Sequence, residues 1–481
     1  MKQKDFIFNI GLLIFLNLLV KPIWILGIDV GVQNSVGAAS YGLYFAVFNF
    51  TFLFNMLLDM GITNFNNRNI AQNAQLLAKH LSGIIALRFL LGGFYMALIF
   101  IVSLIIGYSG FQLQLLFWVA LNQFLSSFIL YLRSNISALL MFKTDSFISV
   151  LDRLIMILLC GILLWGNVTT QPFKIEWFVY CQTAAYLIVF LITGVIVLCK
   201  ARPLKLYWNI TFYRMIIKKS FPYAILFLLM SFYCRIDSVM IERLLPNEIS
   251  TFQVGIYAAA FRLLDALVMI AYLFSVILLP LFAKMLKNKE QIEPIIKSSF
   301  SILYFFSITA TILLVKYRYP ILNLLYDDHI EEIAAIFQLL FPCLIPMSFT
   351  YIFGTLLTAN GNMRLLNITA IAGIILNMCL NLILIPHMKA EGAAIASLST
   401  QGIISIIQII IVFCELKISL NTLPYLRCIG FTVLFIAGEW LLFKYVTLNF
   451  WPHIALSCIT AILLALSTRL IRISTLINQH S

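Results

Sequence analysis

The sequence predicts an all-α membrane protein. Of its 481 residues, 62% are hydrophobic and only 11% are charged, whereas soluble domains carry about 25% charged residues. The mean hydropathy is +1.01. Apolar stretches of about 20 residues recur along the whole chain, and each is long enough to cross about 30 Å of hydrocarbon as a helix.

We predict about fourteen spans. The first apolar run lacks an Ala-x-Ala cleavage site and is too long for the core of a signal peptide, so it is kept as a span. The predicted spans are 6–28, 40–60, 81–107, 113–133, 147–166, 177–199, 220–241, 253–282, 298–316, 333–358, 366–386, 391–413, 427–445 and 452–470.

The distribution of basic residues predicts the orientation. With the N-terminus inside, most of the Lys and Arg residues, Arg153 among them, fall in cytoplasmic segments. This bias follows the positive-inside rule and predicts that both termini are cytoplasmic. Topology thus accounts for the net charge of +13, and we expect no nucleic-acid partner.

Residues that bind metals or cofactors do not cluster in the sequence. The nine cysteines lie singly, without C-x-x-C spacing, and the five histidines are scattered. Buried thiols explain such cysteines better than a metal or disulfide framework does. We therefore predict no metal site and no cofactor.

A short sequence motif that occurs twice in the chain predicts two lobes. Tyr41–Tyr44 (YGLY) and Val254–Tyr257 (VGIY) open the second and eighth predicted spans. Six spans followed by six, related by a repeat, are typical of transporters. The predicted parts are an N-terminal lobe (1–200), a basic cytoplasmic linker (201–219), a C-terminal lobe (220–413), and two extra spans with a cytoplasmic tail (414–481).

Two spans carry charges well inside their apolar runs, Arg235 with Asp237 and Arg262 with Asp265. Each charge at a helix centre costs about 2.5–3.5 kcal/mol in lipid, so these side chains must face each other or a wet cavity. The arginines are predicted to bind an anionic substrate. In the alternative, Arg262 is neutralised by Asp265 on its own helix or by Asp237 across the hairpin. The two aspartates are predicted to support the arginines or to carry a coupling ion, either H⁺ or Na⁺.

Four further charged residues complete the predicted site. Lys21 in the first span and Arg88 in the third are predicted substrate-binding cations of the first lobe. Arg88 snorkelling to the cytoplasmic interface is the alternative for that residue. Asp59 and Arg68, at the cytoplasmic end of the second span, are predicted to set an inner gate. Glu439, inside the thirteenth span, is assigned no role.

Several motifs carry a family resemblance. Leu58–Asn64 (LDMGITN), the RID run at Arg235 with Val254–Arg262 (VGIYAAAFR), and Asn377–Leu382 with Glu391–Ala396 (EGAAIA) occur in order along the chain. Together they resemble Wzx-type polysaccharide flippases of the MOP exporter superfamily. The resemblance implies a MATE-like fold of two six-helix lobes, with two C-terminal helices left over, and alternating access around a cationic central cavity.

The resemblance also implies the cargo and the partners. The cargo is an undecaprenyl-pyrophosphate-linked oligosaccharide, moved to the outer leaflet for O-antigen or capsule synthesis. The partners are this lipid-linked oligosaccharide, membrane lipids, and a polysaccharide polymerase with chain-length proteins.

Three other functions stay open to comparison. A lipid II flippase of peptidoglycan synthesis shares the fourteen spans and the cationic cavity. A MATE-type drug exporter needs carboxylates deep in its spans, whereas Asp29 and Asp59 fall at predicted span ends. A membrane glycosyltransferase or polymerase generally needs a large outer loop or an acidic pair in the first one. The predicted outer loops are short, so we expect a transporter and not an enzyme.

Overall fold

The computed structural model describes residues 16–17, 19–63, 66, 70, 75–139, 141–166, 168–201, 210–416, 422–445, 450–468 and 470. Within these residues the chain forms helices and no strand, which confirms the predicted all-α class. A helix satisfies every backbone donor and acceptor within its own segment, so this architecture suits a chain surrounded by hydrocarbon.

The chain divides into two compact units, Met1–Ala258 (unit 1) and Ala259–Ser481 (unit 2). The boundary falls inside helix α10 (Asn247–Asn288), so the first turns of this helix belong to unit 1. The four-part division expected from the sequence stays a prediction.

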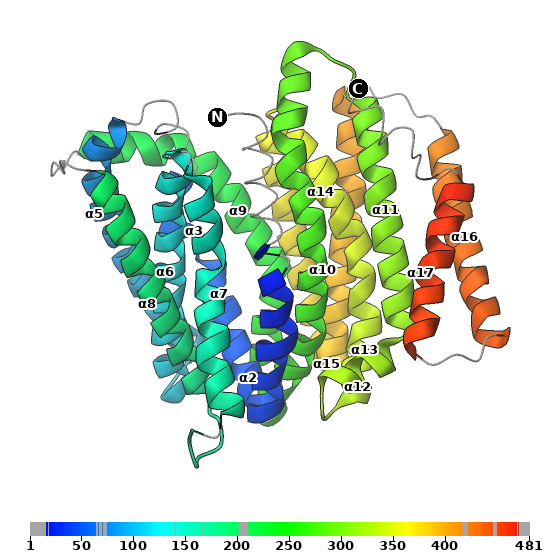
Figure 1. Ribbon diagram of the computed structural model, residues 1–481, viewed down its shortest axis with the longest axis horizontal. Helices are drawn as coiled ribbons and strands as arrows, with labels where there is room; N and C mark the ends of the chain where they lie inside the picture. The colour runs from blue at the N-terminus through cyan, green and yellow to red at the C-terminus, as the bar shows by residue number, and fades with distance from the viewer. Residues whose placement is uncertain are drawn as a thin grey trace. The chain divides into compact units, whose positions relative to one another are not determined.

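Unit 1 is a bundle in which neighbouring helices run side by side (Figure 1). Helix α6 contacts α8 and α2, and α2 in turn contacts α9. Besides the start of α10, the elements described in unit 1 are η1 (Ile23–Asp29), α2 (Val30–Leu53), α3 (Met56–Asp59), α5 (Leu76–Ile106), α6 (Phe111–Ala138), α7 (Phe142–Trp165), α8 (Ile175–Lys200) and α9 (Ile210–Leu244).

The first predicted loop, after residue 28, was placed too early. The chain stays helical through η1 into α2 and turns at Gly37, whose φ of 79° and ψ of 161° are non-helical. Valines 30 and 32 extend the apolar run, and Gly37 is the first residue with the positive φ that glycine adopts without strain. Asp29 therefore lies within a helix and is only 1% exposed.

Gly42 and Gly255, the glycines of the repeated motif, contact each other inside unit 1. A Cβ atom built on Gly42 of α2 would lie 2.6 Å from the backbone nitrogen of Gly255 in α10. The Gln33 side chain adds a hydrogen bond across this contact, from Nε2 to the carbonyl oxygen of Gly255 at 3.0 Å. The absence of side chains at these two positions lets the helix backbones touch.

In unit 2, helix α15 (Met363–Leu416) is interrupted by a residue with a non-helical backbone conformation. In α15, Lys389 has φ 53° and ψ −132°, which separates the two predicted spans 366–386 and 391–413. Besides the rest of α10, the elements described in unit 2 are α11 (Glu293–Lys316), α12 (Arg318–Leu325), α13 (Ile330–Leu340), η2 (Phe341–Cys343), α14 (Leu344–Ala359), α15 (Met363–Leu416), α16 (Thr422–Tyr445) and α17 (Phe450–Ser467).

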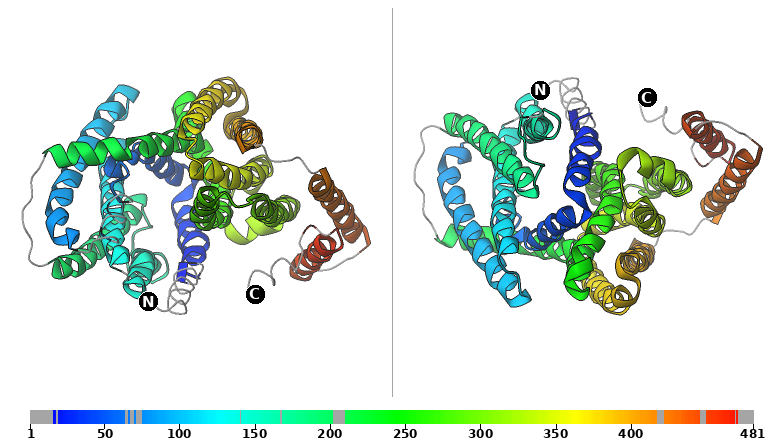
Figure 2. Two further views of the ribbon diagram at one scale, coloured as in Figure 1. Left: turned by 90° about the horizontal axis from the view of Figure 1, so that it is seen from above. Right: turned by 90° about the horizontal axis from the view of Figure 1, so that it is seen from below.

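The last two helices of unit 2 pack against each other and against α11. Seen along the helices, α16 and α17 form a pair at the C-terminal end of the colour scale (Figure 2). Their contact with α11 includes a cluster of buried apolar side chains from all three helices, among them Ile308, Leu313, Phe431, Phe435, Ala461 and Ala465.

Ten of the described helices are long and apolar enough to cross a membrane. Two of them, Leu19–Leu53 and Met363–Leu416, contain the turns at Gly37 and Lys389. Helices α9 and α16 coincide with predicted spans without being among the ten. The multi-pass membrane architecture is confirmed, and the count of fourteen stays a prediction.

Candidate functional site

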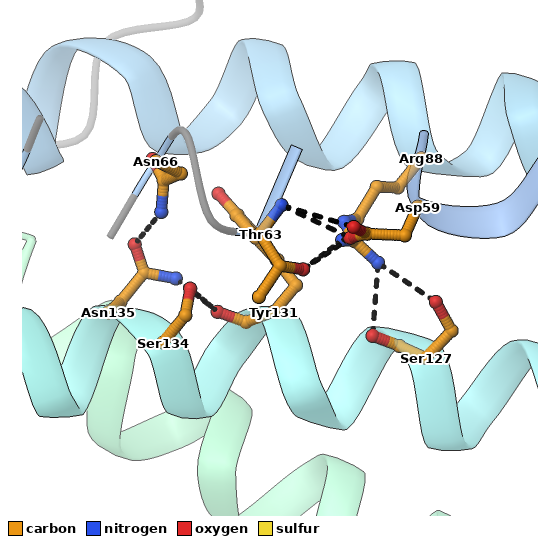
Figure 3. A network of polar contacts seen from close by, with 8 residues as sticks. All are labelled: Asp59, Thr63, Asn66, Arg88, Ser127, Tyr131, Ser134 and Asn135. Atoms are coloured by element: carbon orange, nitrogen blue, oxygen red, sulfur yellow. Dashed lines mark hydrogen bonds and ion pairs between the residues drawn. The ribbon is translucent and has the colours of Figure 1, made fainter. Parts of the chain in front are cut away.

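A buried ion pair between Asp59 and Arg88 joins three helices of unit 1 (Figure 3). Arg88 is 1% exposed. Its Nη2 donates to Asp59 Oδ1 and, at 2.6 Å, to Thr63 Oγ1, while Nη1 donates to the carbonyl oxygen of Ser127 at 3.0 Å. The guanidinium carbon also lies 4.6 Å from the centre of the Tyr131 ring, within cation–π range.

The local sequence explains why Asp59 points at Arg88. Helix α3 ends at Asp59, because Met60 (φ 45°) and Gly61 (φ 78°) take left-handed conformations. The turn brings the backbone N–H of Thr63 to 3.1 Å from Asp59 Oδ1, which fixes the carboxylate. The LDMGIT motif is thus a helix end built to hold a carboxylate beside α5.

The geometry of this ion pair bears on the roles predicted for Arg88 and Asp59. The bonds of Arg88 to α6 and its burial mean that it does not snorkel toward a helix end. Its substrate-binding role and the gate role of Asp59 stay predictions. Arg68, the other predicted gate residue, lies outside the described residues.

A second group of charges in unit 1, here called the cationic cluster, consists of Lys21, Arg133 and Arg153. Lys21 is close enough to interact electrostatically with Arg153, Asp152 and Arg133. Arg133 Nε lies 2.8 Å from Asp145 Oδ1, and Arg153 Nε lies 3.7 Å from Asp152 Oδ2. Among the described residues, the cluster therefore brings three cations together with two carboxylates, Asp145 and Asp152.

The cluster forms because the first helix packs along α7. Asn17 Nδ2 donates to Ser149 Oγ at 3.2 Å, and the Arg153 guanidinium lies 5.2 Å from the centre of the Trp24 ring. Arg153 was predicted to lie in a cytoplasmic segment and was not among the predicted substrate-binding residues, although it interacts electrostatically with Lys21. Its position several residues inside the apolar run 147–166 was the available signal.

The predicted pair of α9 lies in unit 1 with different neighbours for each residue. The Arg235 guanidinium carbon lies 5.1 Å from the centre of the Phe52 ring on α2. Asp237 is 1% exposed and accepts a hydrogen bond from the Tyr257 hydroxyl at 3.0 Å. Asp237 thereby fastens α9 to the first turns of α10.

The predicted pair of α10 lies in unit 2. Arg262 is half-buried and interacts electrostatically with Tyr326 and with Asp265 on its own helix. Burial raises the pKa of Tyr326, which lies between α12 and α13, so its hydroxyl stays protonated. That hydroxyl donates to the carbonyl oxygen of Ala259 at 3.3 Å.

A further buried carboxylate holds one end of unit 1 together. Glu242, near the end of α9, accepts hydrogen bonds from the Tyr108 hydroxyl at 3.0 Å and from Gln112 at 3.1 Å. Arg243 also donates to Glu242, at 3.2 Å, and to the carbonyl oxygen of Ile106 at 3.3 Å. Burial and then the Glu242 carboxylate raise the pKa of Tyr108 well above its ordinary value, so the phenol remains a donor.

Among the described residues, no three His, Cys, Asp or Glu side chains gather closely enough to hold a metal ion. The cationic cluster instead brings three cations together with two carboxylates, whereas Asp237 and Glu242 accept hydrogen bonds that hold helices together. Such a chain can bind anions electrostatically, and arginine contacts phosphate oxygens in pairs.

Two protein-family models match parts of the chain. The family model described as polysaccharide biosynthesis protein matches residues 7–286, and the MatE model matches residues 222–383. A search of curated protein sequences found no match.

Solved structures share the fold. The lipid II flippase MurJ, in an inward closed conformation, aligns with a TM-score of 0.68 and 15% identity over 95% of this chain and 98% of its own. An inward-facing multidrug resistance MATE family transporter aligns with a TM-score of 0.66 and 13% identity over 84% of this chain and 94% of its own. A MOP superfamily transporter from Pyrococcus furiosus aligns with a TM-score of 0.62 and 14% identity over 85% and 95%.

The family model covers more than half of the chain, and the structures carry the same helical architecture along nearly its whole length. The chain therefore belongs to the polysaccharide biosynthesis protein family, and its fold is similar to those of a lipid II flippase and of MATE family transporters.

Proposed function

We propose that this protein flips an undecaprenyl-pyrophosphate-linked oligosaccharide from the cytoplasmic to the outer leaflet of the inner membrane, for O-antigen or capsule synthesis. The observation that carries the proposal is the cationic cluster of unit 1, within a chain of the polysaccharide biosynthesis family. A pyrophosphate cannot cross hydrocarbon unaided, and the three cations beside the first helix would give it a binding partner.

Within unit 1, exposure separates cations that can meet a substrate from those that cannot. The Arg153 side chain is 30% exposed and that of Arg133 is 19% exposed, whereas that of Arg88 is 1% exposed and bonded on several sides. We assign phosphate contact to Lys21 and Arg153, and we assign Arg88 to holding α5 against α3 and α6. Arg235 and Arg262 remain proposed substrate-binding residues, each in its own unit.

Other parts of the proposal follow from the family. We propose alternating access as the mechanism, both termini in the cytoplasm, and no enzymatic step. A polysaccharide polymerase and chain-length proteins would then consume the flipped units.

The first experiment measures the lipid-linked glycans of a strain that lacks the gene. Polyprenyl-pyrophosphate lipids are extracted and identified by mass spectrometry. We expect one complete repeat unit to accumulate, with no surface polymer. Accumulated lipid II with cell lysis would replace the proposal with a peptidoglycan function, and an unchanged lipid pool would end the flippase proposal.

Replacing Arg153 with Gln is expected to reduce export at least about tenfold, because a charged hydrogen bond contributes about 1.5–3 kcal/mol. Lys21→Gln should act in the same direction. Export is measured as surface polymer in the complemented deletion strain, with membrane levels checked by immunoblot.

Lys143→Gln is the matched control, because Lys143 is exposed in the first turn of the same helix. It should export normally. Normal export by both Arg153→Gln and Lys21→Gln would show that the cationic cluster does not contact the cargo.

One observation favours a second candidate, a cation-coupled exporter of the MATE type. Asp29 is buried within a helix of unit 1, where it accepts a hydrogen bond from the Tyr41 hydroxyl at 3.1 Å. A buried carboxylate of this kind is what a cation-coupled exporter requires. Under this alternative the deletion strain would show a normal lipid pool and altered sensitivity to cationic drugs, and Asp29→Asn would reproduce that sensitivity.

A further inference from the structure

A third group of charges lies in unit 2, where α16 and α17 pack against α11. Glu439 of α16 is 3% exposed. Its Oε2 accepts from Lys316 Nζ at 2.6 Å and from Ser457 Oγ of α17 at 3.1 Å. Lys316, the last residue of α11, also donates to the main-chain oxygen of Glu439 at 3.2 Å.

A histidine completes the group. His453 lies one turn before Ser457 on α17 and is 6% exposed. Its Nδ1 shares a hydrogen bond with the hydroxyl of Tyr317, the residue after Lys316, and the two rings meet edge to face with centres 5.7 Å apart. Apolar side chains of all three helices surround these residues.

Each of the two buried titratable side chains presents one polar atom that has no hydrogen-bond partner among the described residues. These atoms are Oε1 of Glu439 and Nε2 of His453. A buried acceptor or donor without a partner costs about 1–3 kcal/mol. Histidine is also the side chain that exchanges a proton near neutral pH.

We propose that Glu439 and His453 form a proton-binding site between α11, α16 and α17. In the tautomer whose Nδ1–H donates to Tyr317, Nε2 holds a lone pair. A proton from water binds there, and the new N–H donates to the Glu439 carboxylate. The imidazolium then competes with Lys316 for the same carboxylate, so proton binding draws Glu439 from α11 toward α17.

The groups around the site favour a proton over a metal cation. A metal cation needs several ligands, and no three His, Cys, Asp or Glu side chains gather among the described residues, whereas a single imidazole nitrogen suffices to bind a proton. Among the described residues, the polar groups that interact with Glu439 or His453 are Lys316 and Tyr317, at and just after the end of α11, and Ser457 with Cys458 of α17.

The test measures the protonation of His453 directly, in the purified full-length protein. Exchange of the histidine C2 hydrogen for deuterium, followed by mass spectrometry of peptides between pH 5 and 9, gives a midpoint for each histidine. His329, exposed between α12 and α13, is the internal control.

Two variants should shift the midpoint of His453 in opposite directions. Glu439→Gln removes the anion beside the imidazolium and should lower the midpoint of His453 by about one pH unit, whereas Lys316→Gln removes the competing cation and should raise it by a similar amount. A purely structural role predicts no such opposition. If one variant fails to fold, the other by itself still tests the proposal. The midpoint of His329 should not change in either variant.

A His453 that does not titrate, or a midpoint that neither charge variant moves, would overturn the proposal. A coupling between proton binding at this site and transport would rest on the proposed function. Such coupling predicts that His453→Gln weakens the dependence of export on external pH. Failure of the flippase proposal would appear in the lipid pool of the deletion strain and would leave the His453 titration unchanged.

Discussion

Asp59→Asn should destabilise the protein by about 3 kcal/mol, the largest loss we expect from an isosteric change. The substitution leaves the Arg88 guanidinium, 1% exposed, without its counter-charge. Removing one partner of a buried ion pair typically costs about 3–5 kcal/mol, because the remaining charge stays buried. The Asp59 side chain is itself 27% exposed, which places the expected loss at the lower end. Thermal unfolding of the purified protein in detergent measures it.

Replacing the other partner of the ion pair, Arg88, should cost less stability. Arg88→Met keeps much of the side-chain volume and leaves behind a carboxylate that reaches water and still accepts from Thr63. The double variant should recover part of the loss of Asp59→Asn, since no unpaired buried cation remains. If Asp59→Asn unfolds at the wild-type temperature, the ion pair does not stabilise unit 1.

Gly255→Ala and Gly42→Ala should each cost about 3 kcal/mol for a different reason. A Cβ atom on Gly42 would lie 1.9 Å from the carbonyl oxygen of Thr251, and one on Gly255 would lie 1.9 Å from that of Ala38. These neighbours are backbone atoms, which cannot rotate away as a side chain does. The helices must separate, and overpacking of this kind typically costs about 1–3 kcal/mol or more.

Gly194→Ala is the matched control, because a Cβ atom on this glycine of α8 would meet nothing within 4 Å. Alanine is favoured over glycine inside a helix by up to about 1 kcal/mol, so this variant should be neutral or more stable. Thermal unfolding and membrane abundance are compared for all three. Equal stability of Gly255→Ala and Gly194→Ala would show that α2 and α10 do not depend on close contact.

The sequence by itself determined the helical class and the approximate place of the helices. The length of an apolar run is a local property, and the bilayer imposes the same length on every span. The spans 366–386 and 391–413 are separated at Lys389, as predicted. The end of the first span was misplaced, because the positive φ that ends it occurs at Gly37, several residues beyond the strongest apolar run.

Only the tertiary structure decided which charges lie together. Arg88 pairs with Asp59, Lys316 pairs with Glu439, and Arg153 interacts electrostatically with Lys21. The sequence shows that a charge within an apolar run requires a partner, but helix rotation and helix neighbours select that partner. Partners such as Lys316 and Glu439 are 123 residues apart, so no local pattern connects them.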